Sequence, residues 1–205
     1  MSVRRTGLVA LTVAILVAGG LFLARGDEPE AAAPPAETLR AGAYDPPRAA
    51  PDFALPGAGG SLVRLSDHRG KVVLLTFGFT HCAAVCPTTL GTLARARAQL
   101  GPAGERAQVI FVTVDPERDT ARQMDSYLDA FDPTFLGATG TPEALAQVRQ
   151  AYGVTAEREG DGPDYAMAHT SGIFLIDPSG RLRAMMPFGR EADDFAHDIA
   201  VLLEG

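Results

Sequence analysis

Two cysteines are the residues of this 205-residue sequence best suited to chemistry. Cys82 and Cys86 lie four positions apart in the run Phe77-Gly-Phe-Thr-His-Cys-Ala-Ala-Val-Cys-Pro87, and the chain has no other cysteine. A disulfide that serves stability joins distant segments, because closing a long loop removes the most entropy from the unfolded chain. This pair closes almost no loop, so we expect its role to be metal binding, redox exchange or both.

The spacing of the pair favours a shared metal ion. Residues four apart on a regular helix have Cβ atoms ~5–6 Å apart, whereas a disulfide needs ~3.5–4.5 Å. Two thiolates that each bind one metal at ~2.3 Å can have sulfur atoms ~4 Å apart. A disulfide between Cys82 and Cys86 requires the loop to tighten, and the usual oxidoreductase spacing, C-x-x-C, is one residue shorter. We therefore predict a metal site first and a redox-active Cys82–Cys86 disulfide second.

A stable site needs at least one further ligand, and the sequence offers four histidines: His68, His81, His169 and His197. His68 lies in a polar turn, and His197 lies in the last predicted helix, where we expect it at the surface. His81 adjoins Cys82, but neighbours along an extended chain point to opposite faces, so we expect it to support the loop.

The ligand types indicate which metal the site would bind. Two soft thiolates and one imidazole favour Cu(I), and they accept Cu(II) with an added oxygen ligand. Zinc fits the same ligands with an open position. Catalytic zinc would also require a general base and a pocket, for which the sequence gives no clear candidate, so copper is preferred.

The elements that would position these residues alternate between buried strands and helices. Continuous apolar runs and a turn at 177–180 predict strands at 72–77, 109–114, 171–176 and 181–186. Start and stop signals predict helices at 87–100, 119–131, 141–152 and 191–203. Two short runs, 52–55 and 62–65, are separated by glycines and predict a hairpin before the first buried strand.

The predicted start of the helix at 87–100 places both cysteines near the positive end of its dipole. Pro87 suits the first position of its helix, with Cys86 as the cap and Cys82 in the preceding loop. The positive end of the helix dipole then favours the thiolate form of both residues. Asp119 is expected to cap the next helix.

This order of elements is the thioredoxin-like α/β plan, with an N-terminal β-hairpin and an inserted helix. We expect a parallel sheet core to which the late hairpin adds an antiparallel edge. Open α/β sheets carry their chemistry at the carboxyl ends of strands, which is where the cysteines fall. In this plan the loop that contains His169 lies against the cysteine turn, so His169 is the expected third ligand.

Three motifs in this order resemble the Sco/SenC family from about Asp52 to the C-terminus. They are V-V-L-L-T-F-G-F-T-H-C-A-A-V-C-P at 72–87, F-V-T-V-D-P-E-R-D-T at 111–120, and H-T-S with I-F-L-I-D-P at 169–178. The resemblance implies a membrane-anchored thioredoxin-like domain that binds one copper ion through Cys82, Cys86 and His169. Asp115 and Asp119 match the family's D-P-E-R-D run, either as turn and cap residues or as partner contacts.

The resemblance also implies a function in assembly of the binuclear copper centre of cytochrome c oxidase. The protein would be a metallochaperone that donates copper to the copper-centre subunit or another copper protein, a reductant of the target's cysteines, or both. The alternatives are a thiol–disulfide oxidoreductase with incidental metal binding and a copper or redox sensor. The family commonly has Pro-Asp between the cysteines and an acidic residue before the histidine, where this chain has Ala83-Ala84 and Ala168. The loss of these polar groups should alter metal affinity or redox potential but not the ligand set.

The N-terminal segment, residues 1–25, predicts a membrane anchor. Thr6 to Ala24 is a stretch of 19 residues without a charge, which as a helix spans ~28 Å, close to the ~30 Å hydrocarbon core. Arg4 and Arg5 place its start in the cytoplasm. A cleaved signal peptide is the alternative, but the run ends Leu-Phe-Leu-Ala-Arg25, a poor cleavage site.

The anchor predicts a single pass through the cytoplasmic membrane, with the C-terminal domain on the periplasmic, extracytoplasmic side. Residues 26–50 are rich in Ala, Pro and Glu and predict a flexible linker, so the domain would cover 51–205. The formal net charge is −7 although three arginines lie in the first 25 residues. An acidic body without a basic cluster argues against a nucleic-acid partner.

Overall fold

The apolar run that begins at Val72 forms the central strand of the computed structural model, which describes residues 38–205. This strand, β4 (Val72–Gly78), is buried at every position. It pairs in parallel with β5 (Ala107–Thr113) and antiparallel with β9 (Ile173–Ile176). Burial on both faces explains why the run is apolar at nearly every position, Thr76 excepted, instead of alternating.

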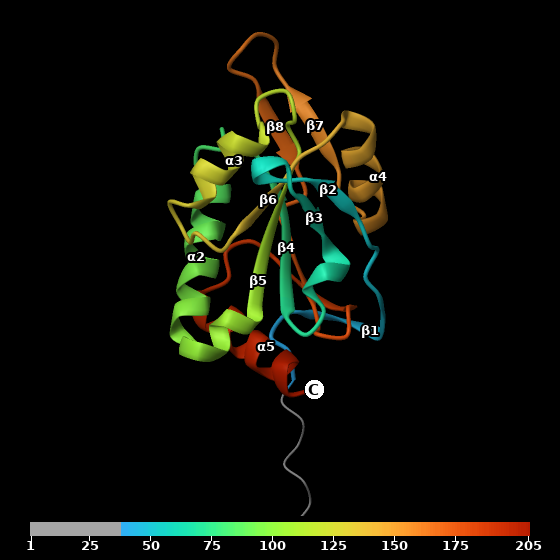
Figure 1. Cartoon of the computed structure of the whole chain (residues 1–205), viewed down its shortest axis with the longest axis vertical. Coiled ribbons are helices and arrows are strands. Elements are labelled where there is room, and N and C mark those ends of the chain that lie inside the picture. The colour runs from blue at the N-terminus through green and yellow to red at the C-terminus, as the bar shows by residue number, and fades with distance from the viewer. Residues whose placement is uncertain (1–37) are drawn as a thin grey trace, which may run out of the picture. The chain divides into compact units, whose positions relative to one another are not determined.

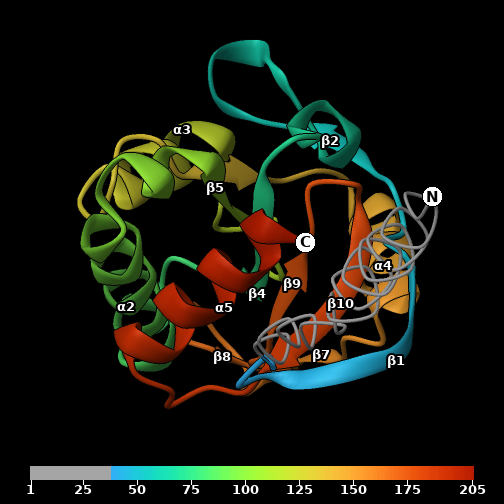
Figure 2. The same ribbon diagram turned by 90° about the horizontal axis from the view of Figure 1, so that it is seen from below.

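Six strands make one mixed sheet in the order β1-β10-β9-β4-β5-β6 (Figure 1, with β9 and β10 labelled in Figure 2). The short strand β6 (Leu136–Ala138) continues the parallel part beside β5. Strands β10 (Arg181–Met186) and β1 (Gly42–Ala49) extend the antiparallel part beyond β9. The predicted α/β fold, with a parallel core and a late antiparallel hairpin, is confirmed.

Helices cover both faces of this sheet. Helices α2 (Val85–Gln99) and α5 (Ala192–Glu204) pack side by side, and α4 (Pro142–Tyr152) lies across the sheet from them (Figure 2). Helix α3 (Ala121–Leu128) packs against β6. The core between these layers contains fully buried large side chains: Phe77, Phe111, Phe174, Leu74, Leu75, Leu90, Leu93, Ile110, Met124, Leu128 and Leu145.

The ends of α4 follow the sequence signals closely. The side chain of Thr141 accepts a hydrogen bond from the Ala144 N–H, and Pro142 takes the first helical position. Gly153 ends the helix in the left-handed conformation, with φ of +70°, which costs glycine little because it has no Cβ.

Two small hairpins and three 3₁₀ segments complete the fold of residues 38–205. The predicted hairpin is present as β2 (Ala54–Pro56) and β3 (Leu62–Arg64). A second hairpin, β7 (Ala156–Glu159) and β8 (Ala166–His169), projects at the top of Figure 1. Its strands are only four residues long and largely exposed, so they give no clear strand pattern in the sequence. The 3₁₀ turns cover Ala58–Gly60, Leu65–His68 and Gly101–Arg106.

Strand β1 corrects the predicted linker. Residues 42–49 lie within the 26–50 segment that composition indicated to be a tether, yet they pair with β10. An edge strand makes ladder hydrogen bonds on one side only, so it tolerates Pro46 and Pro47 and an exposed, polar face. The prediction that the folded domain starts at 51 is wrong for this reason.

The start of β1 is fixed from the opposite end of the chain. The carboxylate of Asp198 is fully buried in α5 and accepts hydrogen bonds from the N–H groups of Arg40 (2.7 Å) and Ala41 (2.9 Å). The predicted anchor at 1–25 and residues 26–37 of the linker lie outside the described residues. Within 38–205 no helix is both long and apolar enough to cross a membrane.

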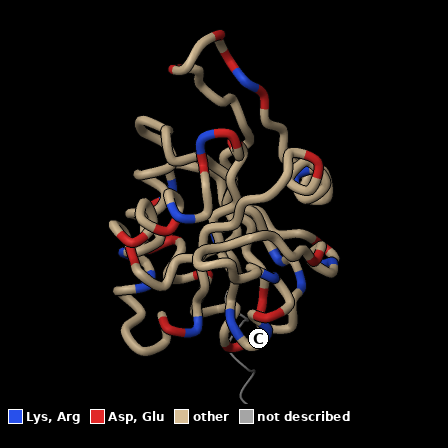
Figure 3. The backbone as a smooth tube through the Cα atoms, turned by 45° about the horizontal axis from the view of Figure 1, so that its top comes forward, with Lys and Arg blue, Asp and Glu red and all other residues tan. Residues whose placement is uncertain are grey.

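Charged residues of both signs are distributed over the fold (Figure 3). Acidic and basic positions alternate even in the β7–β8 hairpin, where Glu157, Arg158 and Glu159 follow one another. The acidic balance of the sequence, 25 Asp and Glu against 18 Lys and Arg, is therefore spread across the domain.

Candidate metal centre

The cysteine pair lies where β4 gives way to α2, at the carboxyl end of the central strand. Cys82 is half-buried in the loop, and Cys86 is buried in the first turn of the helix. The helix begins at Val85, so Pro87 is its third residue and Cys86 is not the cap. Proline is tolerated there because N–H groups of the first turn have no partner within the helix.

Gly78 allows the strand to pass close to the second thiol. A Cβ atom at this position would lie 2.7 Å from Cys86 Sγ and 2.6 Å from a ring carbon of Phe111. Only glycine leaves room for both contacts. The place of Cys86 is therefore set by packing against the end of β4.

The two thiols differ in acidity. Burial raises the pKa of Cys82, but the N–H groups of Cys86 and Ala84 outweigh it and lower the pKa overall. The Cys86 N–H lies 3.4 Å from Cys82 Sγ. Burial, aided by the nearby Cys82, raises the pKa of Cys86 to about 12. Both cysteines are free, so Cys82 ionises first and Cys86 needs a compensating positive charge to follow.

His169 is the last residue of β8 and is half-buried. Its Nδ1 lies 2.9 Å from the carbonyl oxygen of Thr170. A carbonyl can only accept, so Nδ1 carries the proton and Nε2 keeps its lone pair for a metal. The ring packs edge-on against Phe79 in the cysteine loop, with centroids 6.1 Å apart.

One small pocket connects the second cysteine with the histidine. Cys86 and His169 both line it, together with Thr76, Phe77, Val85, Thr89, Leu90, Phe111 and Ser171. Nevertheless, among residues 38–205 no three Cys, His, Asp or Glu side chains lie close enough to hold a metal ion. The three predicted ligands share one end of the fold without forming a closed coordination sphere.

The other histidines lie in different surroundings. His81 is exposed, and its Nδ1 lies 3.2 Å from Thr80 Oγ1, in keeping with the predicted supporting role in the loop. His68 lies in the 3₁₀ turn Leu65–His68, where burial lowers its pKa. His197 is less exposed than predicted, because it is partly buried in α5 with Nε2 3.1 Å from the carbonyl oxygen of Thr38.

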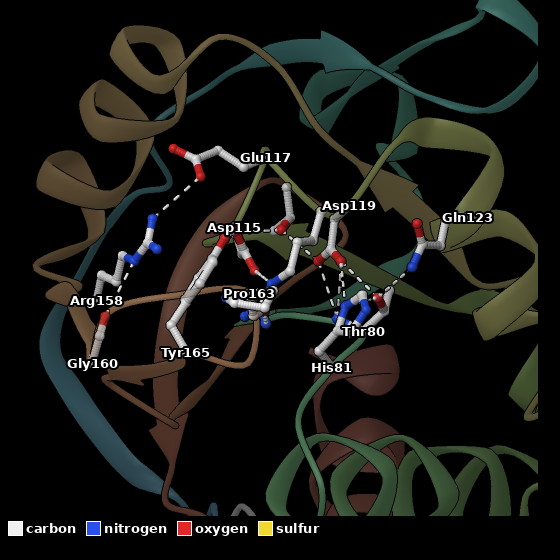
Figure 4. A network of polar contacts seen from close by, with 12 residues as sticks. Thr80, His81, Asp115, Glu117, Asp119, Gln123, Arg158, Gly160, Pro163 and Tyr165 are labelled. Carbon is white, nitrogen blue, oxygen red and sulfur yellow. Dashed lines mark hydrogen bonds and ion pairs between the residues drawn. The ribbon is translucent and has the colours of Figure 1, made fainter.

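Asp119 holds the cysteine loop instead of capping α3. Thr120 is the cap, since its side chain accepts from the Gln123 N–H. The carboxylate of Asp119 is fully buried and accepts from the N–H and hydroxyl of Thr80 and from the Thr113 hydroxyl (Figure 4). The predicted cap is wrong by one residue, because the aspartate side chain turns inward to these donors.

Tyr127 is a neighbour of the site that sequence reasoning missed. Its hydroxyl is buried, and no hydrogen-bond partner for it is present among the described residues. Burial raises the pKa of Tyr127, and the nearby Cys86 and Cys82 raise it further. No local pattern marks this residue, since its closeness to the cysteines depends on how α3 packs over β5.

Comparison with known proteins identifies the family. The model of the SCO1/SenC family matches residues 41–204. The chain belongs to the SCO1/SenC family. The matched range also includes β1, in agreement with a folded unit that starts before residue 51.

Relatives and solved structures support this assignment. The mitochondrial SCO2 homolog of Bos taurus is 38% identical over 152 residues, which are 72% of this chain and 57% of that protein. The chain thus spans just over half the length of this curated relative. Copper-bound ScoI of Bradyrhizobium japonicum is 35% identical with a TM-score of 0.69, over 75% of this chain and 99% of that one. Apo Sco1 of Thermus thermophilus is 42% identical with a TM-score of 0.72, over 82% and 98%.

These matches confirm the predicted family and its thioredoxin-like fold. They bear on the domain and not on the first 40 residues, which the family model does not cover. The ligand set of this chain, Cys82, Cys86 and His169, stays a prediction that rests on the geometry described above.

Proposed function

We propose that this protein is a copper-binding assembly factor for cytochrome c oxidase. It would bind one copper ion, as Cu(I) or Cu(II), and deliver it to the binuclear copper centre, reduce the cysteines of that centre, or do both. The observation that carries the proposal is the shared pocket of Cys86 and His169 beside the Cys82 loop. Support comes from membership in a family described as cytochrome c oxidase assembly proteins and from a relative whose structure contains copper.

The donor set fits Cu(I) as cargo. Cys82 and Cys86 supply soft thiolates and His169 supplies an imidazole nitrogen, which together suit Cu(I) better than harder cations. The high pKa of Cys86 fits a ligand that loses its proton when the metal binds.

A copper titration of the reduced full chain tests the ligand set. We expect one tightly bound Cu(I) per chain, and we expect His169→Ala to weaken binding by about 100-fold or more, since even residues behind a ligand typically matter 10–100-fold. His68→Ala is the matched control, because His68 lies in the turn before β4, at the opposite end of that strand. Equal affinity of His169→Ala and wild type would refute the three-ligand site.

A thiol–disulfide reductase is the second candidate, and the unequal thiols favour it. Cys82 as thiolate would attack a target disulfide, form a mixed disulfide and release one target thiolate. Cys86 would then give up its proton and attack Cys82 Sγ, which forms the Cys82–Cys86 disulfide and releases the second target thiol. The two electrons come from the cysteine pair.

The variants separate these candidates. His169→Ala should weaken copper binding but keep reductase activity, whereas Cys86→Ser should trap the mixed disulfide on Cys82. If His169→Ala lowered the reductase activity as much as it lowers the copper affinity, the thiol reaction would not be independent of the metal site. The sensor alternative stays a prediction for which the described residues offer no specific support.

The N-terminal anchor and the periplasmic location are proposed from the sequence. A single-pass segment at 1–25 would tether the domain at the outer face of the cytoplasmic membrane. The expected result is that the full chain sediments with membranes and that deletion of 1–25 releases it. Release of the full chain by a high-salt wash alone would contradict an inserted anchor.

A further inference from the structure

A short turn between β5 and α3 contacts both parts of the candidate metal centre. We call residues 115–119, the D-P-E-R-D run, the 115–119 turn. It folds on itself, with the N–H groups of Arg118 (3.3 Å) and Asp119 (3.0 Å) donating to the Asp115 carbonyl oxygen. Its two aspartates are buried and point to different neighbours (Figure 4).

One end of the turn holds the cysteine loop. Both carboxylate oxygens of Asp119 lie within 3.2 Å of the Thr80 N–H, and the Thr80 hydroxyl donates to Oδ1 at 2.6 Å. The Thr113 hydroxyl donates to Oδ2 at 2.7 Å. Thr80 lies two residues before Cys82, so the buried carboxylate fixes the loop at the base of the cysteine pair.

The other end of the turn holds the hairpin that carries His169. The Tyr165 hydroxyl, just before β8, donates to Asp115 Oδ1 at 2.5 Å. Arg118 Nε donates to the second oxygen of Asp115, also at 2.5 Å, and its Nη1 reaches the Pro163 carbonyl oxygen at 3.5 Å. Asp115 is therefore shared between the turn and the hairpin.

Arginines on both faces of Tyr165 strengthen this end. The guanidinium carbon of Arg118 lies 3.6 Å from the ring centroid and that of Arg158 lies 3.8 Å from it, which are cation–π distances. Arg158 in turn reaches Glu117 of the turn at 3.5 Å. Arg118 also lies 5.7 Å from the ring centroid of Phe79, the residue that packs on His169.

We propose that the 115–119 turn is a bracket that sets the distance between the cysteine loop and His169. Asp119 positions the loop, and Asp115 with Arg118 positions the hairpin. All three are positioning residues that do not touch the metal. The role deepens the proposed function, since it concerns how the same site assembles from two segments that lie almost 90 positions apart in the sequence.

The bracket predicts that its two ends act through different ligands. Charge-assisted hydrogen bonds are about twice as strong as neutral ones. Replacing Asp115 or Asp119 by Asn therefore keeps the side-chain shape and weakens the hydrogen bonds that the carboxylate accepts. Weaker hydrogen bonds to Asp115 should reduce only the contribution of His169 to Cu(I) binding. Weaker hydrogen bonds to Asp119 should change the Cu(I) binding and the redox equilibrium of the cysteine pair, whether or not His169 is present.

Double-mutant cycles on the full chain test this division. Asp115→Asn should weaken Cu(I) binding about tenfold in wild type, within the 10–100-fold range of residues that orient ligands, and have no effect in the His169→Ala background. The equilibrium constant for oxidation of Cys82–Cys86 by glutathione should not change in Asp115→Asn. Tyr165→Phe removes the same hydrogen bond from the other side and should repeat both results.

Asp119→Asn should give the opposite pattern. It should change the glutathione equilibrium constant about tenfold, and it should weaken Cu(I) binding equally in both backgrounds, with effects of the size that residues behind ligands produce. Thr80→Val removes the hydroxyl partner and replaces Asp119→Asn if that variant does not fold. Asp161→Asn is the matched control, because this exposed hairpin acid has no bond to the turn, and it should leave all readouts unchanged.

Two results of the copper-binding and glutathione measurements would overturn the bracket. One is an Asp115→Asn loss that persists in the His169→Ala background, and the other is a glutathione equilibrium that Asp119→Asn leaves unchanged. Hydrogen exchange in the metal-free protein tests the bracket separately from the proposed function. Asp115→Asn should speed exchange in 156–169 and Asp119→Asn in 79–84, even if the wild type binds no copper. Equal acceleration of both segments by both variants would also refute it.

Discussion

At the scale of single residues, the two cysteines are chemically unequal although their sequence positions look alike. Cys82 is half-buried and receives backbone N–H groups at the start of α2, while Cys86 is packed against Gly78 and Phe111. The sequence predicted the pair, but its expectation that the helix dipole favours the thiolate at both residues holds only for Cys82. It could not predict the inequality, because the depth of each thiol depends on how β4 and α2 pack.

This inequality predicts different alkylation rates in the reduced, metal-free chain. The thiolate reacts, so the pKa lowered at Cys82 and raised to about 12 at Cys86 should make iodoacetamide label Cys82 first at pH 7. The rate at Cys82 should level off at a lower pH than the rate at Cys86, which should still rise at pH 10. Peptide mass spectrometry measures both sites. Equal rates across this range would contradict the assignment.

The close approach at Gly78 predicts a large effect for a small substitution. Gly78→Ala places a Cβ 2.7 Å from Cys86 Sγ and 2.6 Å from the Phe111 ring, and such overpacking typically costs about 1–3 kcal/mol. Urea denaturation should show this loss, together with weaker Cu(I) binding because Cys86 is displaced. Gly91→Ala in α2 is the control: its Cβ would have Arg95 at 3.8 Å as its nearest neighbour, so it should be neutral or stabilising. Equal stability of the two variants would argue against the close packing.

At the scale of elements, the sequence predicted those helices and strands whose apolar residues follow a regular pattern. The strands at β4, β5, β9 and β10 and the helix α4 were found because burial on one or both faces leaves a pattern. β1 and the β7–β8 hairpin left none, since their side chains are largely exposed. The missed hairpin matters most, because it carries His169, one of the three predicted ligands.

Strand β1 has a predicted effect on stability that composition alone would not suggest. Deleting residues 38–50 removes the partner of β10 and both N–H donors to the buried Asp198 carboxylate. An unpaired buried charge costs at least about 1–3 kcal/mol, and the open edge loses its ladder as well. Thermal unfolding should show a midpoint at least about 5 °C below that of the full chain. An unchanged midpoint would mean that residues 38–50 do not stabilise the fold and act as a flexible linker, as composition predicted.

At the scale of the whole molecule, the candidate site is an assembly of three distant segments at one end of the sheet. The cysteine loop and the 115–119 turn carry recognisable motifs, whereas the β7–β8 hairpin gives no strand pattern in sequence. Parallel pairing of β4 with β5 brings the first two together, and Tyr165 docks the third on Asp115. The order of elements and the family motifs were enough to predict the ligands. The contacts that position the ligands could not be predicted, because they form between segments that are distant in the sequence.

Such an assembly predicts that copper stabilises the fold by joining the loop to the hairpin. A ligand that binds only the folded chain adds RT ln(1 + [L]/Kd), about 4 kcal/mol at a thousandfold excess over Kd. For a domain of this size, the midpoint of thermal unfolding should rise by roughly 8–16 °C with Cu(I). His169→Ala should lose most of this rise, because the two thiolates then bind within one turn and leave the hairpin free. Calorimetry of the reduced chain with buffered Cu(I) measures it. An equal rise in His169→Ala would mean that copper binds without joining the segments, and the hairpin would then have no part in the site.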